Sequence, residues 1–219
     1  MKSKVLKKSE NLLLNGPVGK IECLLEIPED CHSRQVTLIC HPHPLHRGTM
    51  QNKVVHTLAR SMHDLKIPTL RFNFRGVGAS QGKYADGVGE TDDAVFLSRW
   101  LLNMFPNADL WLAGFSFGGM VAAMAANRCD ARQLITIAPA VGMIGVDMKL
   151  QPKANWLLVH GADDELIDTA AVLSWVKTLT TEPDVVILPN TTHFFHGQLI
   201  ILRKLLAKRL SDTMQYNKN

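Results

Sequence analysis

The fold is decided by the stretch WLAGFSFGG, residues 111–119, in which an apolar run meets a serine that lies between glycines. A helical pattern of small residues follows directly, over residues 120–126. A strand, a tight turn and a helix in this order are the context in which the pattern G-x-S-x-G exposes a nucleophilic serine. Gly114 and Gly118 suit such a turn, because a Cβ there would clash or resist the backbone angles. The stretch predicts Ser116 as a nucleophile, and a serine that caps a helix is the alternative.

Length and composition favour an ordinary globular chain with a substantial core. The 219 residues are 46% hydrophobic and 20% charged, so we expect one domain over residues 1–219. The net charge of +4 comes mostly from basic residues near the two ends, without a basic stripe carrying interleaved aromatic residues. We therefore expect no nucleic-acid partner. No apolar run reaches the length of a membrane span, so we expect no membrane partner either.

The cysteines and the N-terminal residues favour a cytoplasmic location. Cys23, Cys31, Cys40 and Cys129 are scattered along the chain without a C-x-x-C motif. This usage is typical of a reducing compartment rather than of a disulfide scaffold. The basic N-terminus lacks the long apolar segment of a signal peptide.

Short apolar runs alternate with helical patterns over most of the chain. Near-continuous apolar strands between helices are typical of a parallel sheet that is covered on both faces. Two apolar runs around the turn cluster NGPVG, residues 15–19, predict an antiparallel hairpin. We therefore expect an α/β fold with a doubly wound, mostly parallel sheet of about eight strands and an N-terminal hairpin. The expected strands are 12–14, 21–27, 36–40, 69–74, 110–113, 134–138, 156–159 and 185–188, and the expected helices are 49–65, 90–103, 169–179 and 197–210.

Two loops that follow predicted strands carry the partners that a serine nucleophile needs. In such sheets ligands bind beyond the carboxyl ends of the strands. A serine hydroxyl requires a base, and the base requires an orienting acid. The segment HGADDELI, residues 160–167, follows one strand, and THFFHG, residues 192–197, follows another. The candidate residues are Asp163 and Asp164 for the acid, and His193 and His196 for the base.

Five segments together make the sequence resemble the α/β-hydrolase superfamily over nearly the whole chain. The sequence looks most similar to the small uncapped hydrolases near the dienelactone-hydrolase-like enzymes. The resemblance implies an α/β-hydrolase fold without a cap domain, and an activity that needs no cofactor. The matching segments are HPHPLHRGTM (41–50), RFNFRGVGASQG (71–82), GFSFGG (114–119), HGADDELI (160–167) and THFFHG (192–197).

The resemblance also assigns roles to individual residues. It places the nucleophile at Ser116 and the base at His193. The family pattern H-G-x-x-D-x-x-hydrophobic selects Asp164 as the acid rather than Asp163, because Ile167 then takes the apolar position. His196 stays as the rival base.

An oxyanion hole needs two preorganised N–H donors. One is expected from Phe117, the residue after the nucleophile. The other is expected from the loop after the third strand, in which the two prolines have no N–H. His43 aligns with the family's usual position, right after a His-Gly pair that is His41-Pro42 in this chain. Leu45 is the alternative donor.

These assignments predict a serine hydrolase that forms an acyl-enzyme from a small ester or thioester. Between the sixth and the seventh strand only residues 141–153 are available for a lid, too few for a helical cap, so we expect an open site that takes short acyl groups. Met143, Ile144 and Val146 are candidates for the wall of the acyl pocket. A small acyl substrate is the expected partner, and the sequence carries no signal for an oligomeric state.

Two other hydrolase classes compete with this interpretation. A serine peptidase uses the same three residues, although peptidases of this fold usually carry a large extra domain. The pattern H-x-H-x-x-H, made by His41, His43 and His46, resembles part of a zinc site, but Leu45 stands where a metallo-β-lactamase-type enzyme has an acid. We therefore expect no metal. The glycine-rich segment 76–82 fits a structural turn better than a dinucleotide site, since its third glycine is misplaced and no helix follows promptly.

Overall fold

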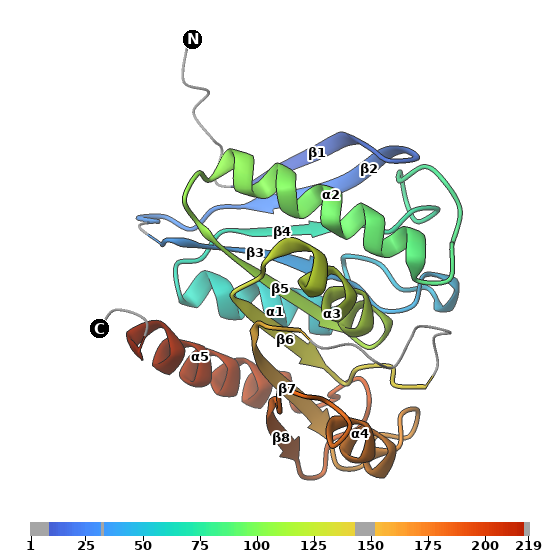
Figure 1. Ribbon diagram of the computed structural model, residues 1–219, viewed down its shortest axis with the longest axis vertical. Coiled ribbons are helices and arrows are strands. Elements are labelled where there is room, and N and C mark those ends of the chain that lie inside the picture. Colours follow the sequence, from blue (N-terminus) through green and yellow to red (C-terminus); the bar gives the residue numbers. More distant parts are fainter. Residues whose placement is uncertain (1–8, 32, 143–151, 217–219) are drawn as a thin grey trace.

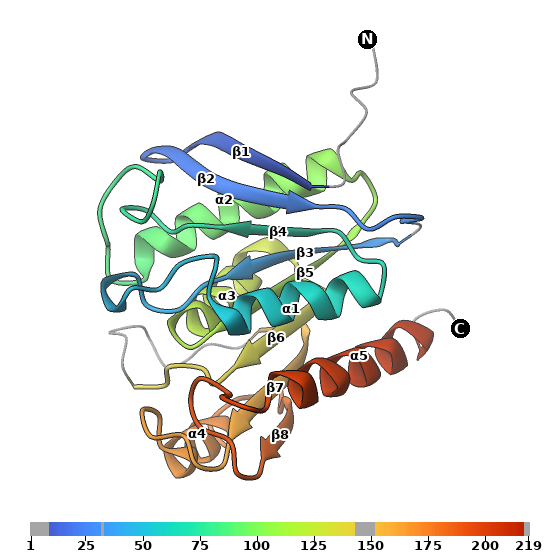
Figure 2. The same cartoon turned by 180° about the vertical axis from the view of Figure 1, so that it is seen from behind.

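Eight strands form one sheet in the computed structural model, which describes residues 9–31, 33–142 and 152–216. The strand order is β1-β2-β4-β3-β5-β6-β7-β8 (Figures 1 and 2). β2 pairs antiparallel with both β1 and β4, and every other neighbouring pair is parallel, which confirms the predicted sheet with its N-terminal hairpin. The strands are β1 (Ser9–Gly16), β2 (Gly19–Glu26), β3 (Gln35–Cys40), β4 (Thr69–Phe72), β5 (Asp109–Phe115), β6 (Gln133–Ile137), β7 (Asn155–Gly161) and β8 (Asp184–Leu188).

Helices cover both faces of the sheet. α2, α3 and α4 lie over one face, whereas α1 and α5 lie over the other (Figures 1 and 2). Two clusters of buried apolar side chains fill the two resulting layers. The helices of the described residues are α1 (Lys53–Asp64), α2 (Val88–Met104), α3 (Phe117–Cys129), α4 (Thr169–Val176), α5 (Leu199–Tyr216) and the short 3₁₀ helix η1 (Pro44–His46).

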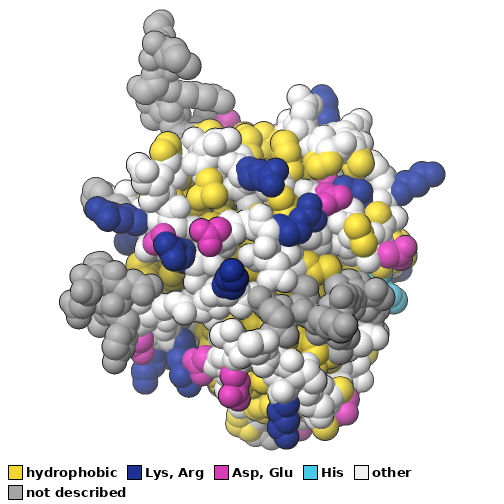
Figure 3. All heavy atoms as spheres, viewed as in Figure 1, with side chains coloured by type: hydrophobic (Ala, Val, Ile, Leu, Met, Phe, Trp, Pro, Cys, Tyr) yellow, Lys and Arg dark blue, Asp and Glu magenta, His cyan; other side chains and the backbone are white. Residues whose placement is uncertain are grey.

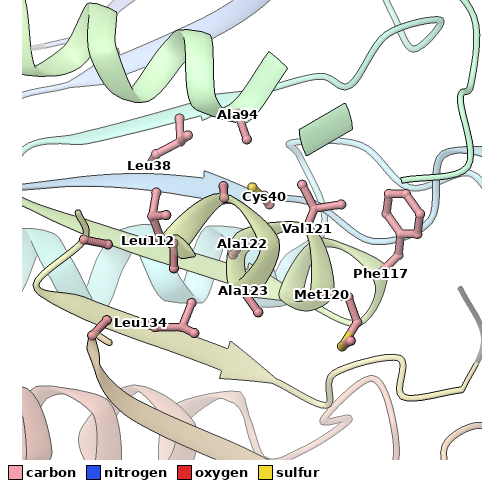
Figure 4. Close-up of a cluster of buried hydrophobic side chains, with 14 of the residues drawn as sticks. Leu38, Cys40, Ala94, Leu112, Phe117, Met120, Val121, Ala122, Ala123 and Leu134 are labelled. Carbon is pink, nitrogen blue, oxygen red and sulfur yellow. The ribbon is translucent and has the colours of Figure 1, made fainter. Parts of the chain in front are cut away.

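The central strand β5 divides its side chains between the two layers. Leu112 points into the layer under α3, whereas its neighbours Trp111 and Ala113 belong to the layer under α1 and α5. Leu112 pairs in register with Leu38 of β3 and Leu134 of β6, so three leucines form a row across adjacent strands (Figure 4). This burial on both faces explains why the central strands appear in the sequence as continuous apolar runs.

Two helices begin later than the sequence pattern suggests. α1 begins at Lys53 rather than near Thr49, because the Asn52 side chain accepts a hydrogen bond from the Val54 amide at 2.8 Å and caps the helix there. α5 begins at Leu199 rather than at Gly197, whose φ of 73° is left-handed and precedes the helix. The apolar periodicity therefore located both helices but not their first residues.

Charges of both signs are mixed over the face that Figure 3 shows, where basic and acidic side chains are interspersed. In the described part of the chain, no helix is long and apolar enough to cross a membrane. No cap domain occurs among the described residues. The segment between β6 and β7 includes Met143, Ile144 and Val146, the candidates for an acyl pocket, and these three lie outside the described residues.

We predict that Leu112→Ala lowers the free energy of unfolding by about 3 kcal/mol, because the deleted atoms leave a cavity in the middle of the leucine row. Urea denaturation followed by circular dichroism measures this change. Leu13→Ala is the matched control, since Leu13 on the edge strand β1 is 49% exposed. Equal losses in the two variants would contradict the packing that we describe for β5.

Candidate active site

Ser116 occupies the tight turn between β5 and α3. Its φ of 55° and ψ of −121° are rare for a residue other than glycine, and such strain costs on the order of 1–3 kcal/mol. The backbone of the turn is held firmly to the end of β6. The Ser116 amide donates to the Ile137 carbonyl at 2.9 Å, and the Ser116 carbonyl accepts from Gly119 at 2.9 Å and from Ala140 at 3.2 Å. The turn therefore places the hydroxyl at the carboxyl end of the sheet, as the sequence pattern predicts.

Close approach of backbone atoms explains the two glycines of the turn. A Cβ on Gly114 would overlap the carbonyl of Gly118, and a Cβ on Gly118 would overlap the carbonyl oxygens of Cys40 and His41. Neither glycine has a positive φ, so the requirement is steric rather than conformational. The first turn of α3 therefore packs directly against the end of β3, and the loop after β3 comes to lie beside Ser116.

His193 connects the loop after β8 to the turn. Its Nε2 lies 3.1 Å from Ser116 Oγ, and its Nδ1 lies 2.8 Å from Asp164 Oδ2. Because a carboxylate only accepts hydrogen bonds, Nδ1 carries the proton and Nε2 is free to accept the serine proton. His193 is 2% exposed, and its ring packs against Phe115 and Phe194 with ring centroids 5.1 Å apart in each pair. The backbone amide of His193 donates to Glu165 Oε2 at 3.0 Å.

Asp164 holds the imidazole from the loop after β7. Its carboxylate is fully buried, and Oδ1 accepts hydrogen bonds from the amides of Leu166 at 3.0 Å and Ile167 at 2.8 Å. Burial on its own would raise the pKa of this carboxyl group. The hydrogen bonds from His193 and from the two amides outweigh burial and hold the pKa of Asp164 below its usual range. The group is therefore ionised near neutral pH and suited to stabilise a protonated imidazole.

The rival acid and the rival base lie elsewhere. The side chain of Asp163 is exposed, and its amide donates to the Thr191 carbonyl at 3.0 Å. His196 is also exposed, and its ring stacks on Phe194 with centroids 5.9 Å apart. The structure thus brings Asp164 and His193 to Ser116, and not their neighbours.

His160 holds the loop after β7, which carries Asp164, and the sequence did not predict this role. The side chain is fully buried, and Nε2 donates to the Ile167 carbonyl at 3.1 Å and lies 3.6 Å from Asp164 Oδ2. Burial lowers the pKa of His160 despite the neighbouring carboxylate, so the neutral ring is favoured. The signal was present, since His160 opens the pattern H-G-x-x-D, but the contact with Ile167 depends on how the loop folds back.

The loop after β3 places the His43 side chain against α3. His43 Nδ1 accepts from the Leu45 amide at 3.2 Å, so the ring proton resides on Nε2, which donates to the Tyr84 hydroxyl at 3.2 Å. The amide of Leu45, the alternative oxyanion donor, is thereby engaged. The ring of His43 also lies 4.8 Å from that of Phe117, whose own amide is the first of α3 and has no acceptor within the helix.

The buried side chain of His41 fixes the start of the same loop. Its Nδ1 donates to the Pro42 carbonyl at 2.6 Å, and its Nε2 accepts from the Phe74 amide at 2.9 Å. The ring is fully buried, and burial lowers the pKa of His41 to about 4. The neutral ring therefore links the loops that follow β3 and β4.

The histidines of this loop are engaged with the protein itself. The four ring nitrogens of His41 and His43 are all engaged in hydrogen bonds within the protein. In the part of the chain that the structure describes, no group of three or more His, Cys, Asp or Glu side chains is placed to hold a metal ion.

A cavity of about 350 Å³ opens onto the candidate nucleophile. The loop after β3 and the start of α1 form one wall, and the loops after β7 and β8 form the opposite wall. The lining residues are Pro42, His43, His46, Arg47, Gly48, Asn52, Ser116, Phe117, Ala140, Leu166, Ile167, His193 and Phe194.

Comparison with known proteins agrees with this fold. Residues 33–157 match the family described as serine aminopeptidase, S33. An α/β serine hydrolase homologue from Coxiella burnetii has 42% sequence identity and a TM-score of 0.91, with 94% of this chain and 100% of that chain covered. XC6422 from Xanthomonas campestris, described as an α/β serine hydrolase without lid, has 42% identity and a TM-score of 0.87, with 92% and 93% covered. The chain belongs to this family of α/β serine hydrolases.

Two more distant proteins extend the comparison. The uncharacterized protein RP471 of Rickettsia prowazekii is 34% identical over 194 residues, which cover 84% of this chain and 81% of that protein. A dienelactone hydrolase from Anabaena variabilis is 18% identical with a TM-score of 0.74, and 92% of this chain and 97% of that chain are covered. The second likeness concerns the fold alone.

We predict that His41→Gln makes the free energy of unfolding depend less on pH between 7 and 4.5. The pKa of His41 lies at about 4 in the fold and at 6.5 ordinarily, so the unfolded chain binds this proton more readily. The neutral ring therefore contributes fully to the free energy of unfolding above pH 6.5. This contribution, about 3 kcal/mol, is lost as the pH falls towards 4. Urea denaturation at pH 7, 5.5 and 4.5 measures the free energy of unfolding.

His41→Gln should be less stable than the wild type at pH 7, and the gap should shrink as the pH falls. His63→Gln is the control, because His63 is exposed on α1 and should follow the wild-type curve. A gap between His41→Gln and the wild type that stays constant from pH 7 to 4.5 would contradict the neutral buried ring.

Proposed function

We propose that the protein is a serine hydrolase that cleaves small or short-chain carboxylic esters or thioesters through an acyl-enzyme. One observation carries the proposal: Ser116 Oγ, His193 and Asp164 form a hydrogen-bonded chain with distances of 3.1 and 2.8 Å, and it opens into the cavity. Nucleophile, base and orienting acid in this order are the arrangement that acyl transfer requires.

The proposed reaction proceeds in two halves. Ser116 Oγ attacks the carbonyl carbon while His193 Nε2 takes the hydroxyl proton, and Asp164 stabilises the resulting imidazolium. His193 then gives that proton to the departing alcohol or thiol, which leaves an acyl group on Ser116. In the second half His193 deprotonates a water molecule that attacks the acyl carbon. The bond from that carbon to Ser116 Oγ then breaks, His193 returns the proton to Oγ, and the carboxylic acid is released.

The oxyanion of each tetrahedral intermediate is assigned to two backbone amides. Phe117 contributes the first, at the positive end of α3, and His43 contributes the second. The engagement of the Leu45 amide by His43 Nδ1 favours His43 over Leu45 for this role. The Tyr84 hydroxyl and the Phe117 ring, both in contact with the His43 ring, would keep this loop in place before substrate binds.

The family description makes an aminopeptidase the second candidate. An aminopeptidase must bind the positively charged α-amino group of its substrate, which acidic side chains do best. Among the described residues that line the cavity there is no Asp or Glu, whereas Arg47 is one of them. The charge of the cavity therefore favours the ester or thioester over a free peptide N-terminus.

A cytoplasmic location is part of the proposal. Cys23, Cys31, Cys40 and Cys129 are all free, although two of them are buried. Free thiols are the usual state of cysteines in a reducing compartment. Burial raises the pKa of the Cys23 thiol to about 12, so that thiol is inert rather than a rival nucleophile.

We predict that Ser116→Ala abolishes labelling by a fluorescent serine-directed phosphonate and lowers kcat for 4-nitrophenyl butyrate by about four orders of magnitude. The reason is that, among the described residues, Ser116 carries the hydroxyl that is hydrogen-bonded to His193. Ser211→Ala, on the exposed side of α5, is the matched control and should label like the wild type. A chelator should leave wild-type activity unchanged, and labelling that survives in Ser116→Ala would contradict the proposed nucleophile.

We also predict that kcat/KM falls along the neutral series 4-nitrophenyl acetate, butyrate, octanoate and palmitate, beginning at octanoate. The physical reason is the size of the cavity, about 350 Å³, which suits a small ligand rather than a long chain. Initial rates at matched substrate concentration below the micelle-forming range measure the series. A steady rise in kcat/KM up to palmitate would contradict the short-chain preference.

A further inference from the structure

We propose that Arg47 binds a free carboxylate on the acid half of the substrate, so that the preferred substrates are monoesters or monothioesters of dicarboxylic acids. The inference rests on the proposed function and names the substrate class of the same site. The cavity carries a positive charge that the cleavage of an ester by Ser116 does not itself require.

Arg47 carries the permanent charge of the cavity. Among the described lining residues it is the single Lys, Arg, Asp or Glu, and the remaining polar side chains are Ser116, Asn52 and three histidines. No carboxylate among the described lining residues offsets the guanidinium. A cavity with one sign of charge concentrates ligands of the opposite sign.

The guanidinium of Arg47 is available to a ligand. The side chain is exposed, and within the described part of the chain it makes no ion pair and no side-chain hydrogen bond. Other arginines of the protein are satisfied internally: Arg75 pairs with Asp93, and Arg203 pairs with Asp64. A planar fork of unused N–H donors matches the two oxygens of a carboxylate.

The strand order places Arg47 on the acyl side of the nucleophile. Arg47 follows η1 in the loop after β3, which also carries the proposed oxyanion donor His43, and β3 is the neighbour of β5. The loops after β7 and β8 lie on the other side of β5, and they bring His193 to Ser116.

The leaving group must lie on the His193 side, because His193 returns the proton to the departing oxygen or sulfur. On this side the cavity is lined by Leu166 and Phe194, which are 53% and 38% exposed. An apolar leaving group suits these side chains. The acyl chain then extends towards the opposite wall, where Arg47 can take its terminal carboxylate.

The test compares two esters with the same leaving group, mono(4-nitrophenyl) adipate and methyl 4-nitrophenyl adipate, which differ in one carboxylate. We expect the wild type to favour the anionic ester by about tenfold in kcat/KM, as a charge-assisted hydrogen bond at a partly exposed site allows. The ratio should fall to about one in Arg47→Gln and recover in part in Arg47→Lys. It should also fall as salt is raised, because salt screens an exposed pair.

Arg60→Gln is the matched control, since it removes the same charge from an exposed position on α1 that does not line the cavity. This variant should keep the wild-type ratio. A second pair of probes, 4-carboxyphenyl hexanoate and 4-methoxycarbonylphenyl hexanoate, carries the charge on the leaving group and should show no preference that depends on Arg47.

The outcomes separate the two proposals. Hydrolysis of both adipate esters with a ratio near one, or a preference that persists in Arg47→Gln, overturns the role of Arg47 and leaves the serine hydrolase intact. An Arg47-dependent preference for the charged leaving group overturns the assignment to the acid half. If the wild type hydrolyses 4-nitrophenyl butyrate but neither adipate ester, the role of Arg47 is overturned and the serine hydrolase stands. If it hydrolyses none of the three esters, the proposed function itself is overturned.

Discussion

The close approach between the first turn of α3 and the end of β3 is the constraint on which the site depends. The backbone of Gly118 lies against the carbonyl groups of Cys40 and His41, and no side chain fits between them. This contact places the helix terminus and the loop after β3 on the same side of Ser116. The two amides assigned to the oxyanion, those of Phe117 and His43, come from these two segments. The strained backbone of Ser116 is held in place by its bonds to the end of β6.

Two buried neutral histidines hold the loops that surround this turn. His41 bonds the loop after β3 to the Phe74 amide, and His160 at the end of β7 bonds to the Ile167 carbonyl in the loop that follows this strand. In both rings burial lowers the pKa, so each keeps one donor and one acceptor nitrogen near neutral pH. The rings therefore fix loop backbones without adding charge next to the candidate base His193. Preorganisation of this kind reduces the rearrangement needed when substrate binds.

The sequence alone predicted the sheet, the hairpin and the layers, because continuous apolar runs and helical periodicity report burial directly. The positions after predicted strands pointed to Ser116, to Asp163 or Asp164 and to His193 or His196. The resemblance to the α/β-hydrolase superfamily then selected Asp164 and His193. The α/β-hydrolase assignment is confirmed by the comparisons, whereas the roles of these three residues stay predictions.

Features that depend on contacts between distant segments could not be predicted in the same way. The bond between Tyr84 and His43 spans 41 residues and leaves no periodic signal. The start of α1 depends on the Asn52 side chain, which caps the helix after a turn whose residues also fit the helical pattern. Arg47 was visible in the sequence, but its place on the cavity wall follows from the path of the loop through η1.

The electrostatics of the site follow from where its one buried carboxylate lies. Asp164 is shielded from solvent behind His193, and His193 and two backbone amides satisfy its oxygens. Its negative charge is therefore directed at the His193 ring and contributes little to the open cavity. Among the described residues that line the cavity, Arg47 and the first residue of α3 at its positive end are both sources of positive potential. The same field that would stabilise an oxyanion would thus attract a second negative group and repel an ammonium ion, so the proposed ester reaction and the proposed anionic acyl group have the same electrostatic origin.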